Sequence, residues 1–249
     1  MLLAPQPDAS AQKVSKDLIL VLDRSGSMEG EKFEQAREAL RYILRHLNEG
    51  DRFYLQSFSS DIQTYARELR PASEANDALR WVERMSATGA TDINRALLEA
   101  ADVADRERPT YLIFLTDGFI GNEAEILGEL QSTLGENTRL FSIGVGSSPN
   151  RYLIEGLAEE GRGHAYYVGL NEDPDESVAA IYEKINDPYL VGIDIDWGDL
   201  DVHDIYPSRI PDLYAGEPLV IVGQYDGSGS ETIRLTGTVA GDRWSQELD

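Results

Sequence analysis

The feature that most constrains the fold of this chain is a pair of unbroken apolar runs, Leu18 to Leu22 and Tyr111 to Leu115. A strand with one face in water alternates apolar and polar residues, so an unbroken run indicates a strand buried on both faces. After the first run, apolar residues recur at helical spacing from Phe33 to Leu47. A buried strand followed by a helix is typical of a parallel sheet covered by helices.

The alternation of strands and helices continues to about residue 187. Further strands are predicted over residues 52–58, 62–69, 139–145 and 164–168, the second of them at a sheet edge. Further helices are predicted over residues 78–85, 93–104, 123–134, 152–158 and 175–185. We therefore predict an α/β domain over residues 17–187, with a doubly wound, mostly parallel, Rossmann-like sheet.

The pattern changes after Asp187-Pro188. Residues 188–249 contain only strand-like segments, at 191–197, 219–225, 231–239 and 244–248, with turn signals between them. They predict a second, all-β module, too small for a β-sandwich on its own. We expect this module to be partial and to need strands from sequence outside this chain. Residues 1–16 are polar and are predicted to be a linker or the end of a preceding β module.

Charge and cysteine content exclude several classes of function. The chain has 45 Asp and Glu against 22 Lys and Arg, and its net charge of −23 disfavours binding to nucleic acid or to an anionic membrane. The lack of cysteine excludes disulfides and thiolate metal sites. No stretch is long and apolar enough to insert into a membrane, and the first residues lack the features of a signal peptide. An acidic surface poor in lysine suits high-salt surroundings.

Oxygen-bearing side chains follow the predicted buried strands. Asp23, Ser25 and Ser27 come after the first apolar run, Asp117 comes after the second, and Thr91 precedes a predicted helix. Ligands of doubly wound sheets bind beyond the carboxyl ends of the strands, and carboxylates and hydroxyls suit hard cations. We predict that the first three residues bind Mg²⁺ or Mn²⁺ directly, and that Thr91 and Asp117 do so directly or through water. Ca²⁺ shares these ligands.

The same residues resemble a known family. Asp23-x-Ser25-x-Ser27, Thr91 and Asp117 match, in order and strand context, the metal-ion-dependent adhesion site (MIDAS) of von Willebrand factor type A domains. The resemblance covers the whole predicted α/β domain, and three segments far apart in sequence make the match specific. It implies that an acidic residue of a protein ligand completes the metal coordination. It also implies that ligand binding shifts the last helix of the domain in some members.

Further segments are similar to the inter-α-trypsin inhibitor heavy-chain type of this family. These are Gly50-Asp51-Arg52-Phe53, Ser57-Phe58-Ser59, and Pro207 to Gly223 with its Pro211-Asp212-Leu213 and Gly216-Glu217. The resemblance implies a flanking β-rich module into which the A domain is inserted. Arg24 stands where animal members often have threonine, which suggests a bacterial protein.

Other candidate sites have simpler explanations. The acidic run from Asp194 to Asp204 could suggest calcium, but apolar residues alternate with its first members, which favours a strand with one solvated face. The histidines His46, His164 and His203 lack the spacing of a zinc motif. An isolated Asp-x-Ser-x-Ser segment could also cap a helix.

These observations together predict a divalent-cation-dependent protein-binding or adhesion domain of a larger exported or cell-surface protein. Its partner would be a protein that presents a carboxylate. The chain has no Gly-x-Ser-x-Gly nucleophile elbow and no Gly-rich phosphate loop, so we predict that it is not an enzyme. Three alternatives stay open: an intracellular adaptor that partners an ATPase, a hydrolase that uses the same Mg²⁺, and a structural domain with an idle metal site.

Overall fold

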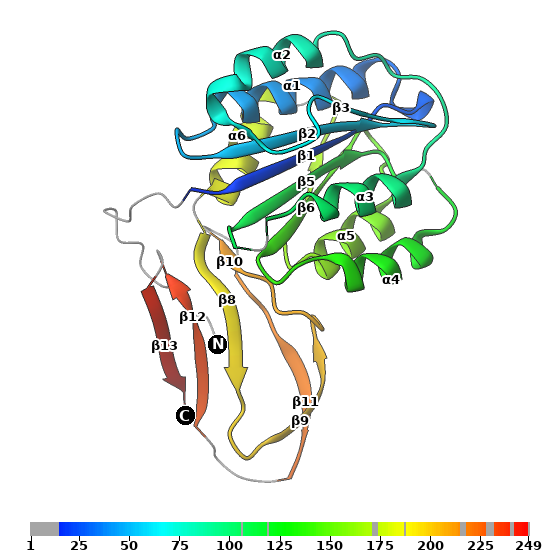
Figure 1. Ribbon diagram of the computed structural model, residues 1–249. Coiled ribbons are helices and arrows are strands. Elements are labelled where there is room, and N and C mark those ends of the chain that lie inside the picture. Colours follow the sequence, from blue (N-terminus) through cyan, green and yellow to red (C-terminus); the bar gives the residue numbers. More distant parts are fainter. Residues whose placement is uncertain are drawn as a thin grey trace. The chain divides into compact units, whose positions relative to one another are not determined.

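The structure is a computed structural model that forms two compact units (Figure 1). It describes residues 15–105, 107–118, 120–170, 174–186, 188–214, 218–227, 232–239 and 242–248. The α/β unit comprises residues 15–182, and the β unit includes residues 183–248. Most of the segment predicted as a linker, residues 1–16, lies outside the described residues.

The α/β unit is built on a seven-stranded, mostly parallel sheet. Its strands are β1 (Asp17–Asp23), β2 (Arg52–Phe58), β3 (Ile62–Thr64), β4 (Arg70–Pro71), β5 (Thr110–Thr116), β6 (Thr138–Val145) and β7 (Ala165–Val168). Their order is β3-β2-β1-β5-β6-β7, with β4 also paired to β2. Only β3 and β4 are antiparallel to their neighbour. The chain turns to opposite sides after β1 and after β5, which makes the space between their carboxyl ends the switch point.

Helices cover both faces of this sheet (Figure 1). They are α1 (Glu31–Arg45), α2 (Ala75–Val82), α3 (Ile93–Asp102), α4 (Glu123–Thr133), α5 (Arg151–Glu160) and α6 (Pro174–Asn186). One layer contains α1, α2 and α6, and Tyr182 of α6 donates a hydrogen bond to the carbonyl of His46, just after α1, at 3.1 Å. The other layer contains α3, α4 and α5, where Leu97 joins Val21 and Phe114 of the sheet in one buried cluster.

Burial explains the unbroken apolar runs. Every residue of β1 and of β5 is buried, and Leu18 to Leu22 are 0% exposed. Both faces of these central strands are therefore core, so neither alternates with polar residues. The predicted doubly wound α/β fold is confirmed.

The β unit has two antiparallel sheets. Its strands are β8 (Pro188–Asp196), β9 (Asp201–Tyr206), β10 (Leu213–Tyr214), β11 (Val222–Asp226), β12 (Ile233–Val239) and β13 (Asp242–Leu248). The order in the larger sheet is β10-β8-β12-β13, and β9 pairs with β11. On β8, Ile193 and Ile195 line an apolar groove, whereas Asp194 and Asp196 are exposed. This alternation is the strand with one solvated face that the sequence predicts.

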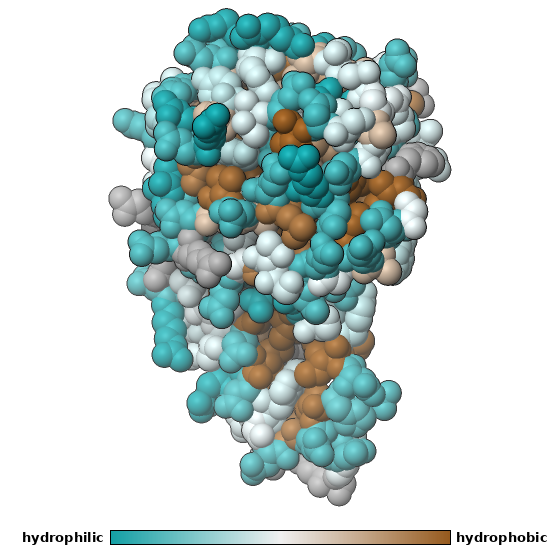
Figure 2. Space-filling model, turned by 45° about the vertical axis from the view of Figure 1, so that its right-hand side comes forward, coloured by the Kyte–Doolittle hydropathy of each residue, from teal (hydrophilic) through white to brown (hydrophobic). Residues whose placement is uncertain are grey.

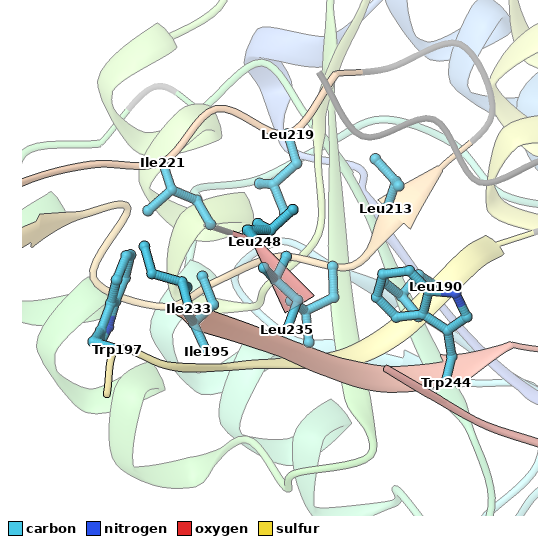
Figure 3. A pocket seen from close by; sticks show the side chains of 11 residues that line it. Leu190, Ile195, Trp197, Leu213, Leu219, Ile221, Ile233, Leu235, Trp244 and Leu248 are labelled. Carbon is cyan, nitrogen blue, oxygen red and sulfur yellow. The ribbon is translucent and has the colours of Figure 1, made fainter. Parts of the chain in front are cut away.

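The groove of the β unit is lined by large apolar side chains (Figure 3). They are Leu190, Ile193, Ile195, Trp197, Leu213, Leu219, Ile221, Ile233, Leu235, Trp244 and Leu248. Figure 2 shows apolar side chains at the surface in the lower part of the view, over this unit. Among its described residues, the β unit thus carries an apolar groove.

Several short strands differ from the sequence predictions, among them β4 and β10, which were not predicted. The strand predicted over residues 62–69 ends at Thr64. Just beyond it, the Tyr65 ring stacks on Phe53 with centroids 5.9 Å apart and contacts Trp81 at 6.3 Å. Strand β9 was not predicted, because the acidic residues there do not resemble a strand; pairing with β11 forms it.

Candidate metal centre

The predicted metal ligands lie at the switch point of the sheet. Asp23 is the last residue of β1, and Asp117 directly follows β5, the parallel neighbour of β1. Ser25 and Ser27 lie in the turn between β1 and α1, where a single turn of 3-10 helix spans Gly26–Met28. The pairing of two strands thus brings together Ser27 and Asp117, which are 90 residues apart in sequence.

Hydrogen bonds link four of the five predicted ligands. Asp23 Oδ1 accepts the backbone N–H of Ser25 at 2.8 Å, and Ser25 Oγ lies 3.1 Å from Ser27 Oγ. Ser27 Oγ donates to Asp117 Oδ1 at 3.0 Å. Both aspartates are 0% exposed, whereas Ser27 is exposed, so the cluster opens to solvent on the serine side.

The charge of this cluster favours a cation. Burial raises the pKa of Asp23 above its ordinary value, and the charge of nearby Asp117 adds to this effect. Hydrogen bonds from Thr116 and Ser25 act in the opposite direction on the same pKa. A pair of buried carboxylates is costly without a compensating positive charge. Because every side-chain donor is a carboxylate or hydroxyl oxygen, the residues fit a hard divalent ion.

Thr91 lies in a neighbouring loop that is hydrogen-bonded to the turn carrying Ser25 and Ser27. Gly26 N–H donates to the Gly89 carbonyl at 2.9 Å, and Thr88 N–H donates to the Arg24 carbonyl at 2.6 Å. Within the described residues, no hydrogen bond joins the half-buried Thr91 side chain to the other four ligands. The loop is therefore adjacent to the cluster. Metal binding by Thr91, as by the other four residues, stays a prediction.

A family profile agrees with this geometry. The profile of the von Willebrand factor type A domain matches residues 16–167, more than half of the chain. The chain belongs to the von Willebrand factor type A domain family. The predicted resemblance is thus confirmed, and the α/β unit is the A domain.

Individual relatives extend the comparison beyond the A domain. Inter-alpha-trypsin inhibitor heavy chain H2 of Sus scrofa is 27% identical over 248 residues, which is 93% of this chain and 26% of that protein. A von Willebrand factor type A structure from Catenulispora acidiphila has a TM-score of 0.68 and 18% identity, over 95% of this chain and 65% of that chain. The chain thus spans about a quarter of the length of its inter-alpha-trypsin inhibitor relative.

A second solved structure shares the fold of the α/β unit. Proximal thread matrix protein 1 from the mussel byssus, described with a zinc-occupied MIDAS motif, has a TM-score of 0.55 and 17% identity. The match covers 69% of this chain and 48% of that chain. At this identity the likeness shows the fold alone.

The structure adds two residues to the site of the A domain that the sequence did not predict. Thr116 Oγ1 donates to Asp23 Oδ2 at 2.5 Å and accepts the Gly118 N–H at 2.8 Å. Lys32 Nζ donates to Asp117 Oδ2 at 2.8 Å and to the Ser27 carbonyl at 3.1 Å. A hydroxyl at the end of the second apolar run was the available signal for Thr116. No local pattern points to Lys32.

Arg24 is held away from the site ligands. Its guanidinium is buried and pairs with Asp61, which follows β2. Arg24 therefore connects neighbouring loops, and its positive charge is paired with the Asp61 carboxylate. Hydrogen bonding to Gln63 and the charge of Arg24 hold the pKa of Asp61 below its ordinary value.

The other candidate groups stay apart. His46 stacks on Tyr42 with centroids 3.9 Å apart, and His203 lies beside Asp204. Among the residues that the structure describes, three or more His, Asp or Glu side chains nowhere gather closely enough to hold a metal, and the run from Asp194 to Asp204 is included. In the same part of the chain, no helix has the length and apolar character needed to cross a bilayer.

Proposed function

We propose that this chain is a divalent-cation-dependent protein-binding domain of a larger exported or cell-surface bacterial protein. Asp23, Ser25, Ser27, Thr91 and Asp117 would hold Mg²⁺ or Mn²⁺, with Ca²⁺ as a further fitting ion. The observation that carries the proposal is the hydrogen-bonded oxygen cluster with two fully buried carboxylates at the switch point of the sheet.

The charges of these residues indicate which chemical group of a partner would complete the coordination. When bound, a divalent ion supplies a strong positive charge and an open coordination position. The carboxylates of Asp23 and Asp117 balance that ion, while Ser25 and Ser27 contribute neutral oxygens. A carboxylate from a protein partner is therefore the group that we expect to complete the coordination. Ser27 is exposed, so a partner has access to the cluster from solvent.

Similarity to inter-alpha-trypsin inhibitor heavy chains supports a binding role, because both share the A domain and the match continues over 93% of this chain. We propose that the domain is not an enzyme. The hydrolase alternative requires metal-dependent turnover of a generic phosphoester, and its detection would overturn this part of the proposal. The intracellular alternative requires a partner ATPase in place of a carboxylate ligand.

The test is isothermal titration of Mg²⁺ and of Mn²⁺ into chelator-stripped protein. The variant is Asp23→Ala/Asp117→Ala, and the control is Asp194→Ala/Asp196→Ala, which removes the same charge from an exposed strand of the β unit. Binding at one site that is lost only in the first variant supports the proposal and justifies a search for carboxylate ligands. Lack of binding by the folded wild type would overturn it, and binding lost only in the control would move the site to β8.

A further inference from the structure

Lys32 brings a positive charge to the metal centre from an unusual position. It is the second residue of α1, where the helix dipole disfavours a cation and where Glu31 and Glu34 are the expected kind of residue. The contacts of its ammonium group with Asp117 and with the Ser27 carbonyl offset that cost. The position of the charge is therefore explained by the metal centre and not by the helix.

The stem of Lys32 passes close to the backbone of Gly146. A Cβ atom built on Gly146, just after β6, would lie 3.0 Å from Lys32 Cε and 3.3 Å from Cδ and Cγ. Gly146 has φ of +104°, so the backbone there favours glycine and leaves room for the lysine chain. The Lys32 side chain is 25% exposed, whereas the Asp117 side chain is 1% exposed. Lys32 thus extends past Gly146 to reach the buried carboxylate of Asp117.

The two aspartates of the site accept hydrogen bonds from different kinds of donor. Asp23 accepts hydrogen bonds from neutral donors, Thr116 Oγ1 and Ser25 N–H. Asp117 accepts a charge-assisted bond from Lys32 on Oδ2 and a neutral one from Ser27 on Oδ1. A divalent ion that binds Asp117 would meet a positive charge already in contact with that carboxylate.

We propose that Lys32 is a tethered cation that competes with the divalent ion for Asp117 and so sets the cation concentration at which the site fills. The inference rests on the proposed metal-dependent function. Without the ion, Lys32 compensates Asp117; with the ion bound, two carboxylates, one dication and one ammonium leave a net charge of +1 at the centre. That surplus attracts an anionic partner group.

The test compares Lys32→Met with wild type by isothermal titration of Mg²⁺ and by thermal unfolding in chelator. Methionine keeps an unbranched stem over Gly146 and removes the charge. We expect Mg²⁺ to bind on the order of tenfold more tightly, since one unit of nearby repulsion is removed. We also expect a lower melting temperature in chelator and a larger rise when Mg²⁺ is added. Arg45→Met, at the other end of α1, controls for the change in net charge.

The outcomes separate this inference from the proposed function. If wild type binds Mg²⁺ and Lys32→Met binds it equally or more weakly, the competition is refuted while the metal site stands. If only Lys32→Met binds, the competition is supported and the proposed function of the natural chain fails. If neither binds, both fail.

A measurement on the natural chain keeps the inference testable should Lys32→Met not fold. The protein has only four lysines, Lys13, Lys16, Lys32 and Lys184, so selective ¹³Cε labelling gives four resolvable signals. Mg²⁺ should shift the Lys32 signal and leave that of Lys16, which pairs with Asp51 at 3.1 Å, unchanged. Saturation of the site with the Lys32 signal unmoved would overturn the inference.

Discussion

At the scale of single residues, Thr116 shows how a neutral side chain supports a charged site. Its hydroxyl donates to Asp23 and accepts from Gly118 N–H, and both contacts lie in the buried interior. Thr116 is thus a positioning residue: it orients the carboxylate and holds the loop that carries Asp117. Removing the hydroxyl would leave a buried acceptor and a buried donor unpaired.

We expect Thr116→Val to lower the free energy of unfolding by about 2 kcal/mol, because its shape is nearly unchanged while two hydrogen bonds are lost. Metal affinity should fall as well, since Asp23 loses its orientation. Urea unfolding in chelator and titration of Mg²⁺ measure the two effects. Thr116→Ser, which keeps the hydroxyl, is the matched control and should retain most of the affinity. Equal metal affinity in Thr116→Val and wild type would contradict the positioning role.

At the scale of elements, the start of α5 braces the loop after β5. Asn150 N–H donates to the Asp117 carbonyl at 2.9 Å, and its side-chain amide donates to the Gly118 carbonyl at 3.0 Å. The same side chain accepts from Leu153 N–H at 3.3 Å as the N-cap of α5. One residue therefore connects the helix that follows β6 with the loop that carries a metal ligand.

We expect Asn150→Ala to cost about 1–2 kcal/mol of stability, through loss of the cap and of the loop contact. Asn122→Ala is the comparison, because Asn122 precedes α4 without a side-chain hydrogen bond to that helix's backbone. Its cost should be clearly smaller. Chemical denaturation in chelator measures both, and equal costs would argue against the bracing role of Asn150.

At the scale of the whole molecule, the net charge of −23 is the dominant property. Self-repulsion of this size opposes the compact state, and salt weakens it because the screening length falls from about 30 Å at 0.01 M to about 3 Å at 1 M. Many arginines pair with acidic neighbours on the same helix, such as Arg37 with Glu34 and Arg95 with Glu99, but exposed pairs contribute little.

We expect the melting temperature in chelator to rise by several degrees between 0.02 M and 0.5 M NaCl, because repulsion among the surplus carboxylates is screened. Thermal unfolding followed by circular dichroism measures it. An uncharged osmolyte at equal osmolarity separates screening from solvent exclusion. A melting temperature that stays constant or falls with NaCl would contradict a stability limited by self-repulsion.

The sequence alone determined the architecture of the A domain and the place of its candidate site. Strands buried on both faces leave an unbroken apolar signature, as in β1 and β5. Parallel strands end at a common edge, so the sequence placed Asp23 and Asp117 at the same edge of the sheet. The pairing of β1 with β5, which the structure shows, then brings the two residues close together. The apolar runs are a local signal, and the common edge follows from the topology of a parallel sheet.

The tertiary structure alone decided which side chains complete the site and where the edge of the sheet breaks. Lys32 contacts Asp117, Arg24 pairs with Asp61, and the Tyr65 ring stacks on Phe53 just beyond the end of β3. Each choice depends on a partner at least 12 residues away in the chain, whose position is set by packing of the whole unit. A sequence pattern records the residue type but not the direction of its side chain, and that direction is fixed only when the distant partner arrives.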